Sequence, residues 1–196
     1  MRPVSNPQNS GHQQSGNQHP DNQHPGTGRP GPGRLPRHVI PRHYALELRP
    51  DLEACTFAGT VAIDAEVLTA CDEVVLNAAE LEVTSAVAVL DGVRHDLTAT
   101  LDEASEELSL RGPALSGGPV RIELAFTGVL NDRLRGFYRS TLVVDGEERT
   151  IATTQFQSTD ARRAFPCFDE PDLKATFGIT LVVPSDMLAV SNGAEP

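Results

Sequence analysis

The sequence of 196 residues has no tryptophan, only three cysteines and no long apolar run. Cys55, Cys71 and Cys167 form no Cys-x-x-Cys pair, and an odd number of thiols is not typical of a disulfide framework. No window approaches the roughly 18 consecutive apolar residues of a membrane span, and the first residues lack the apolar segment of a secretory signal. We therefore expect a protein of the reducing cytoplasm that does not cross a membrane.

Basic side chains are scarce. The sequence has 16 Lys and Arg against 27 Asp and Glu, a net charge of -11. Residues 1–37 hold four Arg and one Asp, so residues 38–196 hold 12 basic and 26 acidic side chains, a net charge of -14. Because nucleic acids and anionic membranes bind basic surfaces, neither is expected as a partner.

Several catalytic motifs are missing. The sequence contains no Gly-x-Ser-x-Gly, no P-loop, no Gly-x-Gly-x-x-Gly and no His-Glu-x-x-His. A serine or cysteine nucleophile would need His38, His43 or His95 as its base, and each lies in or beside a strand-like run, where surface or packing roles are favoured. Cys167 lies between a proline and a phenylalanine, a setting that favours an inert thiol. The sequence predicts neither a catalytic residue nor a metal ligand in this chain.

Residues 1–37 form a distinct N-terminal segment. They contain seven Pro, six Gly and many Asn and Gln, but almost no apolar residue. Such a segment cannot bury enough surface to offset the entropy of ordering. We predict a disordered tail at residues 1–37 and a folded domain at residues 38–196.

The folded domain shows the period-two pattern of strands. Tyr44, Leu46 and Leu48 share one side of a first strand, and residues 57–65 repeat the alternation. Asp-Gly and Gly-Gly-Pro turn signals separate the candidates. Further strands are expected at residues 73–76, 80–90, 93–101, 106–110, 119–130, 136–145 and 175–184. The pattern predicts an all-β fold with an antiparallel sheet or sandwich.

One segment breaks the strand pattern. Ser158, Thr159 and Asp160 suit a helix N-cap, and Pro166 stops a helix, so one short helical turn is expected near residues 159–165. A loop between strands is a common place for functional residues.

The same loop carries two acids and two arginines. Asp169 and Glu170 could in principle act as acid and base. With Arg162 and Arg163 close by in the sequence, ion pairing that fastens the loop is the simpler interpretation.

Gln155 and Gln157 lie two positions apart, just before this loop. On an extended backbone they point to the same side, and two neutral amides can orient a polar ligand. The alternative is that both are ordinary solvent-facing polar residues.

Residues 154–171 (TQFQSTDARRAFPCFDEP) and 174–177 (KATF) resemble the signature near the end of the N-terminal domain of the aminopeptidase N family of zinc metallopeptidases. Residues 136–140 (GFYRS) and 41–46 (PRHYAL) are similar to the same family, so the resemblance covers about residues 38–196. It implies a saddle-like β domain that lends one wall to the substrate pocket of a catalytic domain. In that family the residue matching Gln157 binds the free α-amine of a peptide, and the residue matching Gln155 lines the pocket for the first side chain.

The family's catalytic parts are absent from this sequence. The resemblance implies zinc in the full-length enzyme, yet the His-Glu-x-x-His helix and the Gly-x-Met-Glu-Asn strand are not here. Residues 188–190 read as a strand that enters a Ser-Asn-Gly turn with no returning strand. We expect a C-terminally incomplete domain that is inactive alone and whose partners are peptide N-termini and the missing catalytic domain.

Two alternatives remain open, a stand-alone β-sandwich binding module and a catalytically dead regulatory homologue. A stand-alone module predicts a closed sheet with the C-terminus packed against it. A domain of a larger enzyme predicts an exposed strand edge and an exposed apolar face near residues 155–170.

Overall fold

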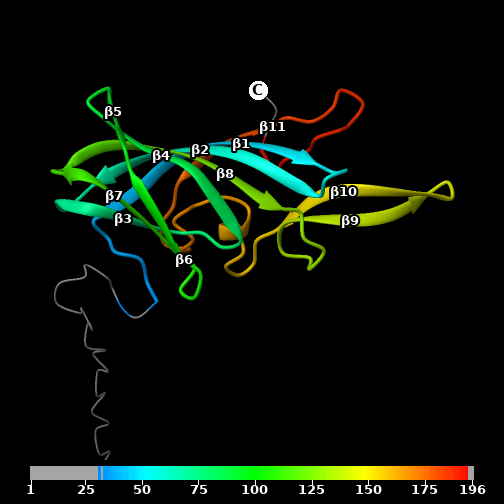
Figure 1. Cartoon of the computed structure of the whole chain (residues 1–196), viewed down its shortest axis with the longest axis horizontal. Coiled ribbons are helices and arrows are strands. Elements are labelled where there is room, and N and C mark those ends of the chain that lie inside the picture. The colour runs from blue at the N-terminus through cyan, green and yellow to red at the C-terminus, as the bar shows by residue number, and fades with distance from the viewer. Residues whose placement is uncertain (1–30, 32, 194–196) are drawn as a thin grey trace, which may run out of the picture.

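The computed structural model describes residues 31 and 33–193 (Figure 1). The disorder expected for residues 1–37 falls mostly outside these residues. Within them the only helix is the 3-10 turn η1 (Ala161–Arg163), and all other regular elements are strands. The predicted all-β fold with one short helical turn is therefore confirmed. No helix in the described part of the chain is long and apolar enough to cross a membrane.

The largest sheet has six strands in the order β11-β1-β2-β8-β4-β5. Alternate residues of its central strands, such as Tyr44, Val61 and Ile122, are almost completely buried, as the period-two pattern predicts. Its strands are β1 (Val39–Asp51), β2 (Thr56–Val67), β4 (Leu81–Leu90), β5 (Val93–Asp96), β8 (Gly118–Val129) and β11 (Thr176–Leu181). The sheet is antiparallel, as expected, except at one edge, where β11 pairs in parallel with β1. Residues 130–175 connect β8 to β11 and bring the chain back to the end at which β1 begins, so β11 runs in the direction of β1. A local sequence pattern does not reveal such a long connection.

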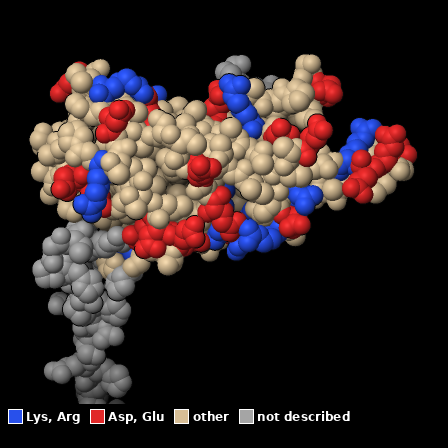
Figure 2. Space-filling model, viewed as in Figure 1, with Lys and Arg blue, Asp and Glu red and all other residues tan. Residues whose placement is uncertain are grey.

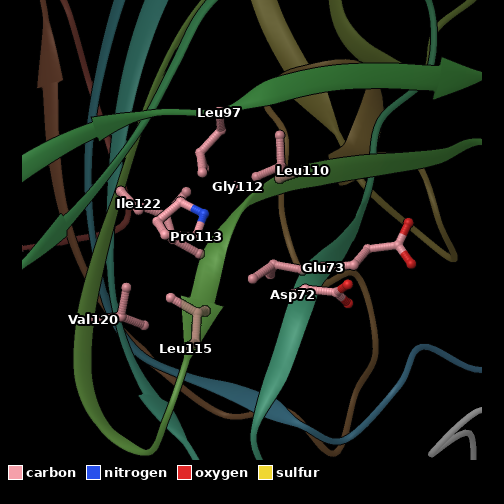
Figure 3. Close-up of a pocket in the computed structure, with 11 residues that line it drawn as sticks. Asp72, Glu73, Leu97, Leu110, Gly112, Pro113, Leu115, Val120 and Ile122 are labelled. Atoms are coloured by element: carbon pink, nitrogen blue, oxygen red, sulfur yellow. The ribbon is translucent and has the colours of Figure 1, made fainter.

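A second sheet packs against the first and completes a sandwich. It contains β3 (Cys71–Asn77), β7 (Glu107–Leu115) and β6 (Thr98–Asp102) in the order β3-β7-β6. Leu110 of the small sheet and Ile122 of the large one line the same apolar gap of about 10 Å³, where the two sheets face each other (Figure 3). That gap holds about one water molecule and no larger ligand.

The single strand expected at residues 93–101 is two strands in different sheets. β5 belongs to the large sheet and β6 to the small one, and the chain crosses between them at Leu97. The N–H of Leu97 donates to the carbonyl of Ala86 at 2.9 Å. The pattern of apolar residues is continuous across this crossing, so it did not reveal the change of sheet.

A third, two-stranded sheet projects from the sandwich as a hairpin (Figure 1). It contains β9 (Gly136–Val144) and β10 (Glu147–Gln155), joined by Asp145 and Gly146, both with positive φ. This is the expected turn, since two-residue hairpin loops favour positive φ at both positions. β10 was not among the strands expected from the sequence, because its residues EERTIATTQ are mostly polar.

The folded body begins before residue 38. Leu35 is 1% exposed and belongs to the main hydrophobic core. Arg34 and Arg37 pair with Glu170 at 3.0 and 2.5 Å, and both also pair with Asp172 at 2.9 Å. The N–H of Leu35 donates to Glu170 as well, at 2.5 Å. Residues 34, 35 and 37 are thus held by partners that lie about 135 positions further along the chain.

The C-terminal part of the described chain departs from the sequence expectation. Residues 188–190 do not form a strand, and Leu188 and Val190 are 89% and 77% exposed. β11 is an exposed edge strand, with Phe177 and Ile179 about half exposed. The apolar face expected near residues 155–170 is instead buried, since residues 164–168 all lie in the interior. Exposed apolar side chains do occur on β11 and in the segment after it, among other places on the surface.

Candidate functional site

The two glutamines singled out by the sequence lie where β10 ends. Gln155 is the last residue of β10 and pairs with Gly136 at the start of β9. Gln157 lies two residues on, in the turn before η1, and the peptide bond between Gln157 and Ser158 is cis. Both glutamines are exposed, and neither side-chain amide has a hydrogen-bond partner among the described residues. Two free amides therefore lie on either side of Phe156.

Phe156 anchors this segment to the core. Its ring meets the ring of Phe165 edge to face, with centroids 6.1 Å apart. Phe165 is 4% exposed and makes similar contacts with Tyr44 and Phe177. Because Phe156 is held by its ring, the amides before and after it are directed to the surface by a fixed backbone.

The Tyr44 hydroxyl lies under the same segment. It accepts a hydrogen bond from the N–H of Phe168 at 3.1 Å. Burial raises the pKa of the Tyr44 phenol, so this side chain stays neutral and serves as packing and as an acceptor.

η1 is fastened by a network of ion pairs. Arg163 donates to Asp160 at 2.8 Å, to Glu80 at 2.6 Å and to Glu106 at 2.5 Å. Arg162 donates to Asp169 at 2.9 Å and to Glu106 at 3.2 Å. Partial burial opposes the charge of Arg163, but its carboxylate partners outweigh burial and raise the pKa of the guanidinium. The interpretation that the loop acids are ion-paired is confirmed for Asp169.

Glu170 has different partners from those expected. Its side chain is 7% exposed and pairs with Arg34 and Arg37 rather than with Arg162 or Arg163. Two guanidinium groups thus engage this carboxylate, which fastens residues 34 and 37 to the loop. Both loop acids are thus engaged in ion pairs with arginines.

Asn77 connects this loop to the small sheet. It is the one buried polar residue in the described part of the chain. Its backbone exchanges two hydrogen bonds with Cys167 at 2.7 and 3.0 Å, and its side-chain oxygen accepts from the N–H of Asp169 at 3.2 Å. Three hydrogen bonds thereby join this buried end of the loop to the last residue of β3.

The remaining candidate groups have ordinary roles. His43 forms a hydrogen bond with Thr176 at 2.8 Å. Burial raises the pKa of the Cys167 thiol well above its usual value, as expected for an inert thiol. Cys55, Cys71 and Cys167 are all free thiols.

No metal centre fits the described residues. Among residues 31 and 33–193, no three His, Cys, Asp or Glu side chains are grouped so that they could hold a metal ion. A catalytic zinc needs three protein ligands and one open position.

The surface of the domain that is seen in Figure 2 carries charges of both signs. In the view of Figure 2, acidic and basic side chains lie next to one another along the lower edge and at the tip of the β9–β10 hairpin. At that tip Arg149 lies 3.6 Å from Glu147. At this tip the charges form a local ion pair rather than a field of one sign.

Sequence reasoning missed Glu80 and Glu106, the two carboxylates that hold Arg163. They lie in turns after β3 and β6, respectively 83 and 57 positions from Arg163. Their one unusual feature, a positive φ in each, appears only in the structure.

Comparison with known proteins gives a consistent result. The model of the peptidase M1 N-terminal domain family matches residues 40–196. The chain is 48% identical over 155 residues to aminopeptidase M1 of Arabidopsis thaliana, with 76% of this chain and 18% of that protein covered. It is 45% identical over 150 residues to aminopeptidase M1-B of Oryza sativa subsp. japonica, covering 76% of this chain and 17% of the relative. It is 41% identical over 156 residues to the alanine/arginine aminopeptidase of Saccharomyces cerevisiae, covering 76% of this chain and 18% of the relative. The chain thus spans less than a fifth of the length of these relatives.

Proposed function

This chain belongs to the peptidase M1 N-terminal domain family. We propose that it is the substrate-recognition domain of a zinc aminopeptidase that removes N-terminal residues from peptides. Its proposed partners are peptide N-termini and the catalytic domain of the same enzyme. The catalytic zinc is held by that other domain, since the described residues here offer no ligand set. The three free thiols support a reducing compartment, and we place the protein in the cytoplasm.

The observation that carries the proposal is the pair of unpartnered amides at the end of β10. The side-chain oxygen of Gln157 is a hydrogen-bond acceptor, which the α-ammonium of a peptide can use as a donor. Gln155, on the other side of Phe156, contacts the first side chain of the peptide. The contact of Gln157 is neutral on the protein side, so it orients the amine with less affinity than a carboxylate would.

The exposed apolar side chains support a domain that is covered in a larger enzyme. Phe177 and Ile179 continue the buried face of β1, since they pair with Tyr44 and Leu46. A stand-alone module would be expected to cover this edge of its core. This favours the enzyme domain over the stand-alone binding module.

The proposal is tested with the 196-residue chain and two peptides, trialanine amide and its N-acetyl derivative. The wild-type chain is expected to bind the first and not the second, and Gln157→Ala is expected to lose this preference. Equal binding of both peptides would rule out recognition of the amine. With added zinc and an alanine anilide, the chain is expected to release no product, and turnover that a chelator abolishes would contradict inactivity alone.

Gln157→Glu supplies a stronger form of the same test. A carboxylate forms a charge-assisted hydrogen bond with the ammonium, which is roughly twice as strong as a neutral one. Trialanine amide should bind Gln157→Glu more tightly than the wild type at pH 7 and low salt, with the gain lost at high salt. Gln155→Glu is the matched control, because it adds the same charge at the other amide.

A further inference from the structure

Arg163 contacts both segments that carry the two amides. Its Nε donates to the Asp160 carboxylate at 2.8 Å. The N–H of Asp160 in turn donates to the carbonyl of Phe156 at 2.9 Å, which closes the turn that contains Gln157. Arg163 therefore holds the closing residue of this turn from outside.

The second contact is with the start of β9. A Cβ atom built on Gly136 would lie 2.6 Å from the Cβ of Arg163, so only glycine allows this approach. Gly136 is the residue that pairs with Gln155. The main chain beside Arg163 therefore sets the position of the strand end that carries Gln155.

The other two donors of Arg163 fix it to the body of the domain. They bind Glu80 at 2.6 Å and Glu106 at 2.5 Å, in the turns after β3 and β6. The Arg163 side chain is only 11% exposed. All three guanidinium nitrogens of Arg163 donate hydrogen bonds, so the planar group is held in one orientation. The ammonium of a lysine, on a flexible chain, would not be held in this way.

Arg162 provides an internal comparison. Its side chain is 12% exposed and it also pairs with Glu106, but its second partner is Asp169 rather than Asp160. If the network only stabilised the fold, loss of Arg162 and loss of Arg163 would have the same effect on the glutamines.

We infer that Arg163, acting through Asp160 and Gly136, is the positioning residue for the Gln155 and Gln157 amides. The inference rests on the proposed function of that site, since the amides need a fixed spacing only if they bind one ligand. Glu80 and Glu106 orient the arginine and do not contact the ligand.

The test uses the ¹⁵N-labelled 196-residue chain, with the side-chain amide signals of the two glutamines assigned from Gln155→Ala and Gln157→Ala. Arg163→Ala is compared with Arg162→Ala, the matched control. Three quantities are measured for each: the melting temperature, the positions of the two amide signals without ligand, and the Kd for trialanine amide. Arg163→Lys and Asp160→Asn complete the set.

Arg162→Ala and Arg163→Ala should lower the melting temperature by similar amounts. Only Arg163→Ala should shift or broaden the Gln157 signal and weaken binding of trialanine amide, by about tenfold if the hydrogen bond to the ammonium is lost. The Gln155 signal should change less, because alanine keeps the Cβ that meets Gly136. Arg163→Lys should not restore the signals, because the lysine lacks the planar fork.

Unchanged glutamine signals in Arg163→Ala, or equal changes in both alanine variants, would overturn the inference. Should Arg163→Ala not fold, Asp160→Asn decides, since it removes one charge and keeps the size of the side chain. A wild-type chain that does not bind trialanine amide would contradict the proposed function alone, because the ligand-free signals still report whether Arg163 positions the amides.

Discussion

Replacing Leu35 by alanine measures whether the folded domain starts before residue 38. A disordered residue would leave stability unchanged, whereas Leu35 is 1% exposed and part of the main core. Leucine-to-alanine changes at buried positions cost about 2–5 kcal/mol, with the smaller values where the surroundings can close over the gap. Leu35 lies in a short segment without regular structure, so the lower part of that range applies, about 2–3 kcal/mol.

The assay is urea unfolding of the full chain, followed by circular dichroism, together with a thermal scan. For a folded domain of about 160 residues, each kcal/mol lowers the melting temperature by roughly 2–4 °C, so Leu35→Ala should lower it by about 5–10 °C. Leu188→Ala is the matched control, because Leu188 is 89% exposed and its loss should change stability by less than about 0.5 kcal/mol. Equal unfolding midpoints for the two variants would refute the assignment of Leu35 to the core.

Three further predictions concern backbone, thiol and charge. Gly136→Ala should destabilise the chain by more than about 1 kcal/mol in urea unfolding, because φ of residue 136 is +68° and the new Cβ would lie 2.6 Å from the Cβ of Arg163. An unfolding midpoint equal to that of the wild type would contradict this close approach. In the native protein at pH 8, Cys167 should resist a thiol reagent until denaturant is added, since burial raises the pKa of its thiol. Labelling of Cys167 at the same rate in the native and the unfolded chain would contradict its burial. Hydrogen bonding from Arg94 lowers the pKa of Glu123. The stability that Glu123 contributes is therefore present above the ordinary glutamate pKa of about 4.3 and is lost as the pH falls below it. Glu123→Gln should flatten this loss in unfolding measured against pH, and an unchanged slope would argue against the pairing of Arg94 with Glu123.

The alternation of apolar residues was enough to predict most of the sandwich. Strands such as β2 and β8 were predicted nearly to the residue because one face of each is buried against a single core, and burial imposes a period of two. The Asp-Gly turn between β9 and β10 was also readable, because positive φ at both positions requires those residue types. β10 itself was missed, since a strand of a projecting two-stranded sheet has no buried face to impose the pattern.

The candidate site was predictable only as a pair of residues. Their spacing in the sequence placed Gln155 and Gln157 close together, and the resemblance to a family supplied a role for them. What the sequence could not supply was the support beneath them. Phe156 packs on Phe165, and Arg163 reaches carboxylates that are 57 and 83 positions away.

By itself the sequence determined most of the strands, the all-β class and the family, because strand pattern, turns and signature segments are local properties of the chain. Tertiary structure alone decided that Leu35 belongs to the core, that β11 runs parallel to β1, and that Glu170 pairs with Arg34 and Arg37. Each of these depends on contacts between residues more than 130 positions apart. Such contacts form only when the whole chain is folded, since the energy of burial and of ion pairing depends on position in space and not on distance along the sequence.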